Sequence, residues 1–314
     1  MAGEPVIVSA QFLMERQDAW NRGYRLFGPD EIATGLPAEV RADAQVVACG
    51  GSLDMALIDE LPGLKLVACF PTGIEGVNVA ALTSRGIAVT NAAGVNAHDV
   101  ADHAMALFLA RWHVIPAADR QVRDPGGWSG FRARVGPRPS LRGRHAGIVG
   151  LGRIGSAIAA RAAAHGLEVR WWGPHNKSGT PFARAESLLE LARWADVLFV
   201  ASRAAPESAG QINAEVLAAL GSDGILVNVS RGILVDEGAL VTALAEGSLG
   251  GAALDVFVEE PTEGARWQAL GDKVVLSPHL AGFTQEAGRD MFGQLRENIR
   301  RHFAGEPLLT PVAR

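Results

Sequence analysis

The stretch HAGIVGLGRIG, residues 145–155, decides the fold that we expect for this chain. A short apolar run typical of a strand leads into a glycine-rich turn. A helical pattern follows, which places Ile154, Ile158 and Ala162 on one face. A strand before G-x-G-x-x-G and a helix after it form the setting in which this motif binds dinucleotides. The stretch therefore predicts a dinucleotide site at this turn.

Each glycine of the turn has its own expected role. Gly150 permits the tight turn, Gly152 lets a pyrophosphate approach the main chain, and Gly155 lets the helix pack closely against the strand. The start of the helix directs free N–H groups and the positive end of its dipole toward the phosphates. The predicted cofactor contacts on the turn are Gly150, Leu151, Gly152, Arg153, Ile154 and Gly155.

Strand and helix patterns alternate from this turn onward. Strands are expected at 145–149, 167–172, 196–201, 225–230, 251–256 and 273–277. Helices are expected in the gaps, at 153–165, 185–194, 213–220 and 237–246. This alternation predicts a doubly wound parallel sheet of the Rossmann type.

The residues before 98 predict a smaller α/β domain. Strands are expected at 5–10, 23–28, 44–50, 64–70 and 87–91. Their apolar runs are continuous rather than alternating, which indicates a parallel sheet covered on both faces. A last helix at 284–304 is expected to return to this domain. We therefore predict one α/β domain from residues 1–97 with 285–314 and a second from residues 98–284.

Residues 98–144 are expected to form an arm of the second domain. Residues 98–113 have a helical pattern, whereas residues 122–143 are rich in Gly, Pro and Arg, have little periodicity and are long for a connection. The second part also contains Trp128 and Phe131, and aromatic residues and Arg are enriched in interface cores. The segment is either a linker whose two rings cap their own domain or an arm that packs on a second subunit.

The composition excludes several classes of protein. Hydrophobic residues make up 48%, charged residues 20%, and the net charge is −5, so neither a nucleic-acid nor a membrane partner is expected. The two cysteines, Cys49 and Cys69, each end an apolar run without metal-ligand spacing, and we expect buried thiols and no metal. No basic segment with a long apolar run begins the sequence, and no run reaches the ~18 apolar residues of a membrane span. A cytoplasmic location is expected.

Three polar residues follow strands of the second series. Arg231 comes after ILVNVS, Glu260 after LDVF, and His279 after VVLSP, so all three are expected at the carboxyl edge of the sheet, where ligands bind. Any one alone would be expected to be a solvated loop residue, but together they suit hydride transfer to a ketone. Histidine can protonate the oxygen, glutamate can favour and orient the imidazolium, and arginine can hold a carboxylate with two hydrogen bonds.

These residues lie in stretches that resemble the D-isomer-specific 2-hydroxyacid dehydrogenase family, most of all its glyoxylate/hydroxypyruvate reductase branch. The matching stretches lie between residues 64 and 290: PTGIEGVNVAAL, RGIAVTN, VADHAMALFLA, GLGRIG, NVSRGILVDEGAL, ALDVFVEEP and SPHLAGFT. The resemblance implies a flavodoxin-like substrate-binding domain beside the Rossmann-type domain. It also implies a two-fold dimer built by residues 98–144, in which Trp128 or Phe131 reaches the partner's active site, with the spacing after Gly-Gly-Trp favouring Phe131.

The resemblance also implies roles for single residues. Arg231 matches the arginine that binds the substrate's carboxylate and carbonyl, Glu260 the glutamate paired with the catalytic histidine, and His279 that proton donor. The main chain at Thr72 and Gly73 matches the loop that holds the substrate carboxylate. Further cofactor contacts are implied at Asp255, on the nicotinamide carboxamide, and at Pro206 and Val229.

One departure from the family concerns the substrate loop. Pro71 stands where the family often has glycine, and proline has no N–H to offer to the substrate. The N–H groups of Thr72 and Gly73 remain for that purpose.

The end of the second strand predicts which dinucleotide is bound. An NAD enzyme of this architecture has an acidic residue about 20 positions past the glycines, but Gly173 stands there and no carboxylate occurs from 169 to 182. His175 and Lys177 follow, and Arg203 is expected at the end of the third strand. This set would attract a 2′-phosphate, so NADP(H) is predicted over NAD(H).

We therefore expect an NADPH-preferring reductase of small 2-keto acids, such as glyoxylate or hydroxypyruvate, that yields D-2-hydroxy acids. One alternative is a reductase of bulkier 2-keto acids such as aryl pyruvates. Another is a non-catalytic nucleotide-sensing regulator on the same scaffold. The sequence does not fix the physiological 2-keto acid or the strength of the cofactor preference.

Overall fold

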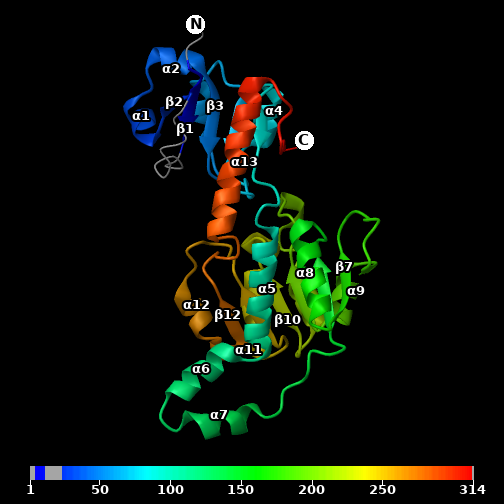
Figure 1. The fold of residues 1–314 in the computed structure, drawn as a ribbon. Coiled ribbons are helices and arrows are strands. Elements are labelled where there is room, and N and C mark those ends of the chain that lie inside the picture. Colours follow the sequence, from blue (N-terminus) through cyan, green and yellow to red (C-terminus); the bar gives the residue numbers. More distant parts are fainter. Residues whose placement is uncertain (1–3, 11–22, 313–314) are drawn as a thin grey trace. The chain divides into compact units, whose positions relative to one another are not determined.

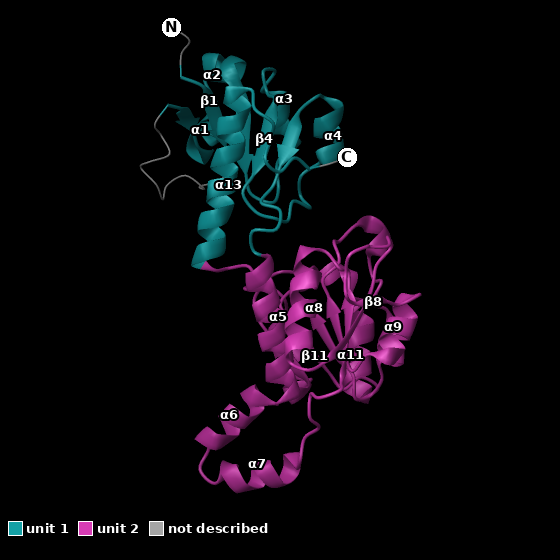
Figure 2. Ribbon diagram, turned by 45° about the vertical axis from the view of Figure 1, so that its right-hand side comes forward, with its two compact units in different colours: residues 1–96, 285–314 teal, residues 97–284 magenta. Residues whose placement is uncertain are grey.

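The computed structural model describes residues 4–10 and 23–312. The chain divides into two compact units, Met1–Asn96 with Gln285–Arg314 (unit 1) and Ala97–Thr284 (unit 2), coloured teal and magenta in Figure 2. Residues 1–3, 11–22 and 313–314 of the predicted first domain lie outside the described residues.

Unit 2 contains a seven-stranded parallel sheet in the order β12-β11-β10-β9-β6-β7-β8. The strands are β6 (His145–Val149), β7 (Glu168–Trp172), β8 (Ala183–Arg184), β9 (Val197–Val200), β10 (Ile225–Asn228), β11 (Gly251–Leu254) and β12 (Val274–Leu276). The chain winds outward from β6 in one direction through β7 and β8, and then in the other from β9 to β12. The predicted doubly wound, Rossmann-type sheet is therefore confirmed.

Helices cover both faces of this sheet (Figure 1). They are α5 (Ala97–Trp112), α8 (Arg153–Ala164), α9 (Leu188–Trp194), α10 (Ala214–Leu220), α11 (Glu237–Glu246) and α12 (Gly264–Gln268). Three short 3-10 helices are η1 (Pro206–Ser208), η2 (Gly232–Leu234) and η3 (Gly271–Lys273). One face packs α5 and α8 on the strands through Phe108, Ile158 and Phe199. The other packs α9, α10 and α11 through Leu191, Leu217 and Leu240. The strands β9, β10 and β11 are buried along their whole length because both of their faces are covered, whereas the edge strand β8 is exposed.

The arm differs from the expectation of an irregular segment. It folds into α6 (Ile115–Arg123) and α7 (Gly127–Val135), which extend away from the rest of unit 2 (Figure 2). The two helices bury little: only Ala117 of α6 is buried, and no residue of α7 is. The apolar residues Ile115 and Val122 share one face of α6, but that face does not pack on the sheet. α7 has little hydrophobic periodicity. The alanine, arginine and glutamine residues of the two helices have high intrinsic helix propensity.

Unit 1 contains a five-stranded sheet in the order β2-β1-β3-β4-β5. The strands are β1 (Val6–Ser9), β2 (Arg25–Phe27), β3 (Ala44–Cys49), β4 (Leu66–Cys69) and β5 (Ala88–Thr90), and all described pairs are parallel. The helices are α1 (Pro29–Thr34), α2 (Ala38–Asp43), α3 (Met55–Asp59), α4 (Val79–Ser84) and α13 (Gln285–Ala304). The order 2-1-3-4-5 is that of flavodoxin, as the sequence implied.

The last helix of the chain covers one face of this sheet. Leu295 and Ile299 of α13 pack on Ile7, Val46 and Leu66. The long C-terminal helix therefore belongs to the same hydrophobic core as the strands at the start of the chain.

Cys49 and Cys69 are buried free thiols, as predicted. They occupy paired positions on β3 and β4, with their Sγ atoms 3.5 Å apart. The hydrogen bond to Cys49, together with burial, raises the pKa of the Cys69 thiol, so it is protonated at neutral pH and unreactive. In the part of the chain that is described, no helix has the length and apolar character needed to cross a bilayer.

Candidate active site

The glycine turn after β6 has the geometry of a phosphate cradle. Gly150 has a φ of 88°, and a Cβ there would lie 2.5 Å from the Cα of Ser202. A Cβ on Gly155 would lie 1.9 Å from the carbonyl oxygen of Gly150. A Cβ on Gly152, in contrast, would meet nothing within 4 Å. Gly152 is also the N-cap of α8 and gives no side-chain cap, which leaves its first N–H groups available to an anion. The turn therefore fits a dinucleotide pyrophosphate.

A group of basic residues surrounds the end of β7. The Nζ of Lys177 donates to the carbonyl oxygen of Leu151 at 2.6 Å and lies 3.4 Å from the Oγ of Ser156, beside the glycine turn. Arg184 on β8 donates to the carbonyl oxygen of Gly173 at 2.7 Å. His175 is exposed. The cationic groups of Lys177 and Arg184 thus lie beside the main chain of Leu151 and Gly173, next to the expected 2′-phosphate site.

Arg203 follows β9, the strand predicted at 196–201, as expected. β9 pairs with β6 on the side opposite β7. A contact of Arg203 with the 2′-phosphate stays a prediction. Pro206 begins η1 after the same strand, and Val229 is buried directly after β10.

Glu260 and His279 form a hydrogen-bonded pair after β11 and β12. The Nδ1 of His279 lies 2.6 Å from the Oε2 of Glu260, and the other carboxylate oxygen accepts the N–H of Phe257 at 2.9 Å. A carboxylate only accepts, so His279 donates from Nδ1, and its Nε2 is left for another partner. The side chain of His279 is 47% exposed and that of Glu260 is 36% exposed, so both groups are within reach of a ligand.

Arg231 occupies the turn after β10, where it is the N-cap of η2. Its Nη1 donates to the carbonyl oxygen of Ser230 at 2.7 Å, and its own carbonyl accepts the side-chain amide of Asn228 at 3.0 Å. The turn is therefore fixed by Asn228, the last residue of the strand. All three predicted residues lie after carboxyl ends of neighbouring strands of one sheet.

The turn that carries His279 has an unusual conformation. His279 has a φ of 54°, in the left-handed region, which costs a residue with a Cβ about 1–2 kcal/mol. Asp255 holds this turn: its carbonyl accepts the N–H of His279 at 2.8 Å, and its carboxylate accepts the N–H groups of Leu280 and Ala281 at 2.8 and 2.9 Å. The carboxylate of Asp255 is fully buried, so its immediate contacts are with the turn. The contact with nicotinamide that the resemblance implies stays a prediction.

Thr72 and Gly73 lie in unit 1, in the loop after β4. The Thr72 hydroxyl donates to the carbonyl oxygen of Ala92 at 2.8 Å, and the side-chain amide of Asn91 donates to the carbonyl oxygen of Thr72 at 2.6 Å. The loop is therefore ordered by residues that follow β5. Its carboxylate-binding role stays a prediction.

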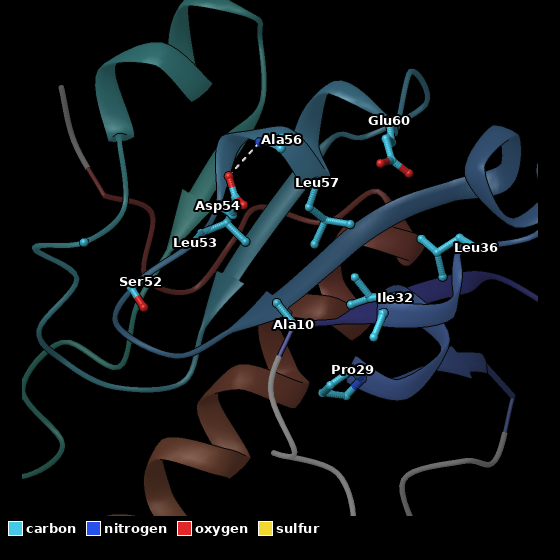
Figure 3. Close-up of a pocket in the computed structure, with 12 residues that line it drawn as sticks. Ala10, Pro29, Ile32, Leu36, Ser52, Leu53, Asp54, Ala56, Leu57 and Glu60 are labelled. Carbon is cyan, nitrogen blue, oxygen red and sulfur yellow. Dashed lines mark hydrogen bonds between the residues drawn. The ribbon is translucent and has the colours of Figure 1, made fainter.

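A pocket in unit 1 lies elsewhere, between α1 and α3 (Figure 3). Its two carboxylates already have partners: Asp54 caps α3 by accepting the N–H of Ala56 at 2.9 Å, and Glu60 lies 3.9 Å from Arg41. Among the described residues that line the pocket, none belongs to the predicted site.

Sequence reasoning missed two residues beside the site. Arg184 lies on a strand of two residues, which is too short for any period to reveal. His103 lies in the stretch VADHAMALFLA, and its Nε2 is 2.8 Å from the Oγ of Ser277. A histidine in an otherwise apolar helical stretch is the only signal that the sequence offers for it.

Comparisons with known proteins agree with this site. A model of the NAD binding domain of D-isomer specific 2-hydroxyacid dehydrogenases matches residues 105–281. The chain is 41% identical over 259 residues to a hydroxyphenylpyruvate reductase of Plectranthus scutellarioides, with 82% of each protein covered. It is 38% identical over 257 residues to a glyoxylate/hydroxypyruvate reductase of Arabidopsis thaliana, with 82% of this chain and 78% of the relative covered.

A solved structure extends the similarity to both units. The chain superimposes on an NADPH-dependent glyoxylate/hydroxypyruvate reductase from Sinorhizobium meliloti in complex with NADP and malonate, with a TM-score of 0.85 and 35% identity. The superposition covers 99% of this chain and 97% of that one. These similarities, together with the glycine turn and the Glu260–His279 pair, show that the chain belongs to the D-isomer-specific 2-hydroxyacid dehydrogenase family.

Proposed function

We propose that this protein is an NADPH-preferring reductase of small 2-keto acids, of the glyoxylate or hydroxypyruvate type, that forms D-2-hydroxy acids. The observation that carries the proposal is the hydrogen bond of 2.6 Å between Nδ1 of His279 and Glu260, in a unit whose glycine turn fits a dinucleotide. Relatives named glyoxylate/hydroxypyruvate reductase support the substrate class.

His279 is the proton donor of the proposed reaction. The bound dinucleotide supplies the hydride that goes to the C2 carbon of the keto acid, and the carbonyl oxygen takes up a proton. The Nε2–H of His279 gives that proton, because Nδ1 is held by Glu260. The negative Glu260 stabilises the imidazolium that must be present before the transfer. Arg231 holds the substrate carboxylate and polarises the carbonyl.

Aryl pyruvates are the second candidate substrate class. Leu280 and Phe283, which follow His279, are 43% and 84% exposed and offer apolar surface to a larger substrate side chain. The relative with 41% identity is named hydroxyphenylpyruvate reductase. A panel of glyoxylate, hydroxypyruvate and 4-hydroxyphenylpyruvate, each with NADPH and NADH, tests the proposal. Loss of NADPH absorbance with the two small acids supports it, and no turnover with any acid would favour a nucleotide-sensing regulator instead.

The basic residues near β7 predict the effect of a charge at Gly173. A Cβ on Gly173 would meet only the Trp171 ring at 3.4 and 3.9 Å, which is ordinary contact, so the main chain at this position accepts a side chain. A unit charge about 4 Å from a phosphate costs about 1 kcal/mol even in water, and we expect KM for NADPH to rise at least ~5-fold. KM for NADH should not rise.

Two further variants complete this test. Gly173→Asn has the same shape as Gly173→Asp without the charge and should change little. Lys177→Ala with Arg203→Ala should weaken NADPH by removing attraction. Steady-state kinetics with both cofactors measures these effects. A wild-type protein that uses NADH with the same efficiency as NADPH would contradict the proposed 2′-phosphate site.

We also propose that α6 and α7 form the interface of a homodimer. Ile115 and Val122 lie seven residues apart on one face of α6 and are 56% and 53% exposed, and Trp128 of α7 is 63% exposed. Phe131 is half-buried, with the guanidinium of Arg134 over its ring at 5.2 Å. Trp128 or Phe131 would then reach the substrate pocket of the partner.

The dimer proposal predicts a mass of twice the 33.0 kDa chain by light scattering. Ile115→Glu with Val122→Glu should give the monomer mass, because two charges would be buried without partners in the interface. Leu309→Glu is the matched control, since Leu309 is 46% exposed in unit 1, outside the arm. A monomeric wild type, or a double variant that stays dimeric, would rule out this interface.

A further inference from the structure

We propose that His103 of α5 is a positioning residue, which acts through Ser277 and the buried Asp255 to hold the turn that presents His279. The inference rests on the proposed function, because it assigns His103 to the proton-donating step. His103 lies 174 residues before Ser277 in the chain and touches the turn only through the fold.

The hydrogen bonds run in one direction from α5 to the turn. The Ser277 hydroxyl donates to Oδ1 of Asp255, because a carboxylate can only accept. The Oγ of Ser277 then has lone pairs left, and the Nε2–H of His103 donates to it at 2.8 Å. The same Nε2 lies 3.3 Å from Oδ1 of Asp255. His103 therefore fixes the rotamer of Ser277 and adds positive electrostatic potential beside a carboxylate that solvent does not reach.

Asp255 restrains the main chain on both sides of His279. Before His279, its carboxylate accepts the Ser277 hydroxyl, and after His279 it accepts the N–H groups of Leu280 and Ala281. Its main-chain carbonyl accepts the N–H of His279 itself at 2.8 Å. The left-handed φ of 54° at His279 persists because these contacts over-determine the turn.

The direction in which the imidazole points follows from this turn. Nδ1 meets Glu260 only while the main chain of His279 keeps its conformation, and Glu260 is itself held by the N–H of Phe257. Loss of the His103 donor frees the Ser277 hydroxyl to rotate and removes one donor from beside a buried carboxylate. The turn then relaxes, and the imidazole moves away from the position in which Nε2 can protonate the substrate.

The test compares two substitutions at one position. His103→Leu removes the hydrogen bond and keeps bulk, whereas His103→Gln places an amide N–H near the position of Nε2. We expect kcat of His103→Leu to fall by about 10- to 100-fold, the range that a small displacement of a reacting group costs. The Kd of NADPH should stay within about twofold, because none of these contacts touches the glycine turn. His103→Gln should recover most of the activity.

A matched control is His113→Leu, the same substitution at an exposed histidine directly after α5, and it should leave kcat unchanged. Ser277→Ala provides a second route to the same link if His103→Leu does not fold. Because both residues act through one chain of hydrogen bonds, the double variant should lose less than the product of the single losses.

Rescue by the glutamine variant, together with the Tm, separates positioning from a loss of stability. A merely structural role predicts that kcat falls only as the folded fraction falls. Positioning predicts a lower kcat in His103→Leu well below its Tm, with the KM for the keto acid little changed. The proposal is overturned by a wild-type kcat in His103→Leu and Ser277→Ala, or by a glutamine variant no better than the leucine one.

The same link can be measured without turnover. The chemical shifts of the His279 ring, measured by NMR in the absence of substrate, should change in His103→Leu and not in His113→Leu. If the wild-type protein reduces no keto acid, the proposed function fails, while this NMR comparison still decides whether His103 positions His279.

Discussion

His279→Ala is expected to lower kcat for keto-acid reduction by about 10²- to 10⁴-fold, which is the usual contribution of a positioned general acid. Without the imidazole, the proton for the carbonyl oxygen must come from water. The Kd of NADPH should change little, because His279 contacts Glu260 and Asp255 rather than the glycine turn. Fluorescence titration measures the Kd and stopped-flow absorbance measures the hydride step. Near-normal turnover in this variant would mean that the proton comes from another group.

Glu260→Gln tests the same pair in a milder way. The amide keeps the size of the side chain and removes its charge, so the imidazolium of His279 loses its stabilising partner. Reduction needs a protonated ring whose Nε2 faces the substrate. The steady-state rate should therefore fall, but by less than in His279→Ala, because the amide oxygen can still accept the Nδ1–H of His279. A wild-type rate in Glu260→Gln would contradict the pairing on which the proposed mechanism depends.

The sequence predicted most of the fold because buried parallel strands are apolar over their whole length. Every strand expected in unit 2 is present, and the signal is strongest for β9, β10 and β11, which are buried along their whole length between two helical layers. One strand of unit 2, β8, was not expected: its two residues, Ala183 and Arg184, are both exposed and form the edge of the sheet. A strand that buries nothing has no hydrophobic signal.

The two helices of the arm were not predicted for a related physical reason. The helices α6 and α7 leave Ile115, Val122 and Trp128 exposed in the single chain, so these apolar residues do not pack on their own sheet. If the proposed dimer forms, the apolar positions match a surface on another copy. A pattern set by a second subunit cannot be read as packing within one chain.

The residues of the site also differ in whether the sequence could predict them. Arg231, Glu260 and His279 could be predicted because each follows a strand, and the carboxyl ends of parallel strands share one edge. The contact of His103 with Ser277 could not, because it depends on how α5 lies across β11 and β12, which no local pattern specifies. Lys177 was predicted to attract the 2′-phosphate, and its hydrogen bond to the carbonyl oxygen of Leu151 ties it to the glycine turn as well.

The glycine turn allows a sharper test of cofactor binding than removal of a charge, because two of its glycines differ in what a methyl group would meet. Gly152→Ala adds a Cβ with nothing within 4 Å, so the protein without cofactor should keep its thermal stability. The methyl group would occupy the space through which the pyrophosphate approaches the main chain. Loss of one hydrogen bond to a charged group, worth about 1.5–3 kcal/mol, weakens NADPH by about 10- to 150-fold.

Gly155→Ala places its Cβ 1.9 Å from the Gly150 carbonyl oxygen, so α8 must move away from the strand. Such overpacking costs about 1–3 kcal/mol, which lowers the Tm of a unit of this size by roughly 2–4 °C for each kcal/mol. Calorimetry without cofactor and titration with NADPH should therefore separate the two variants: Gly152→Ala loses affinity alone, and Gly155→Ala loses affinity and stability together. Equal Tm values for all three proteins would contradict close packing at Gly155, and wild-type affinity in Gly152→Ala would mean that the pyrophosphate binds away from this turn.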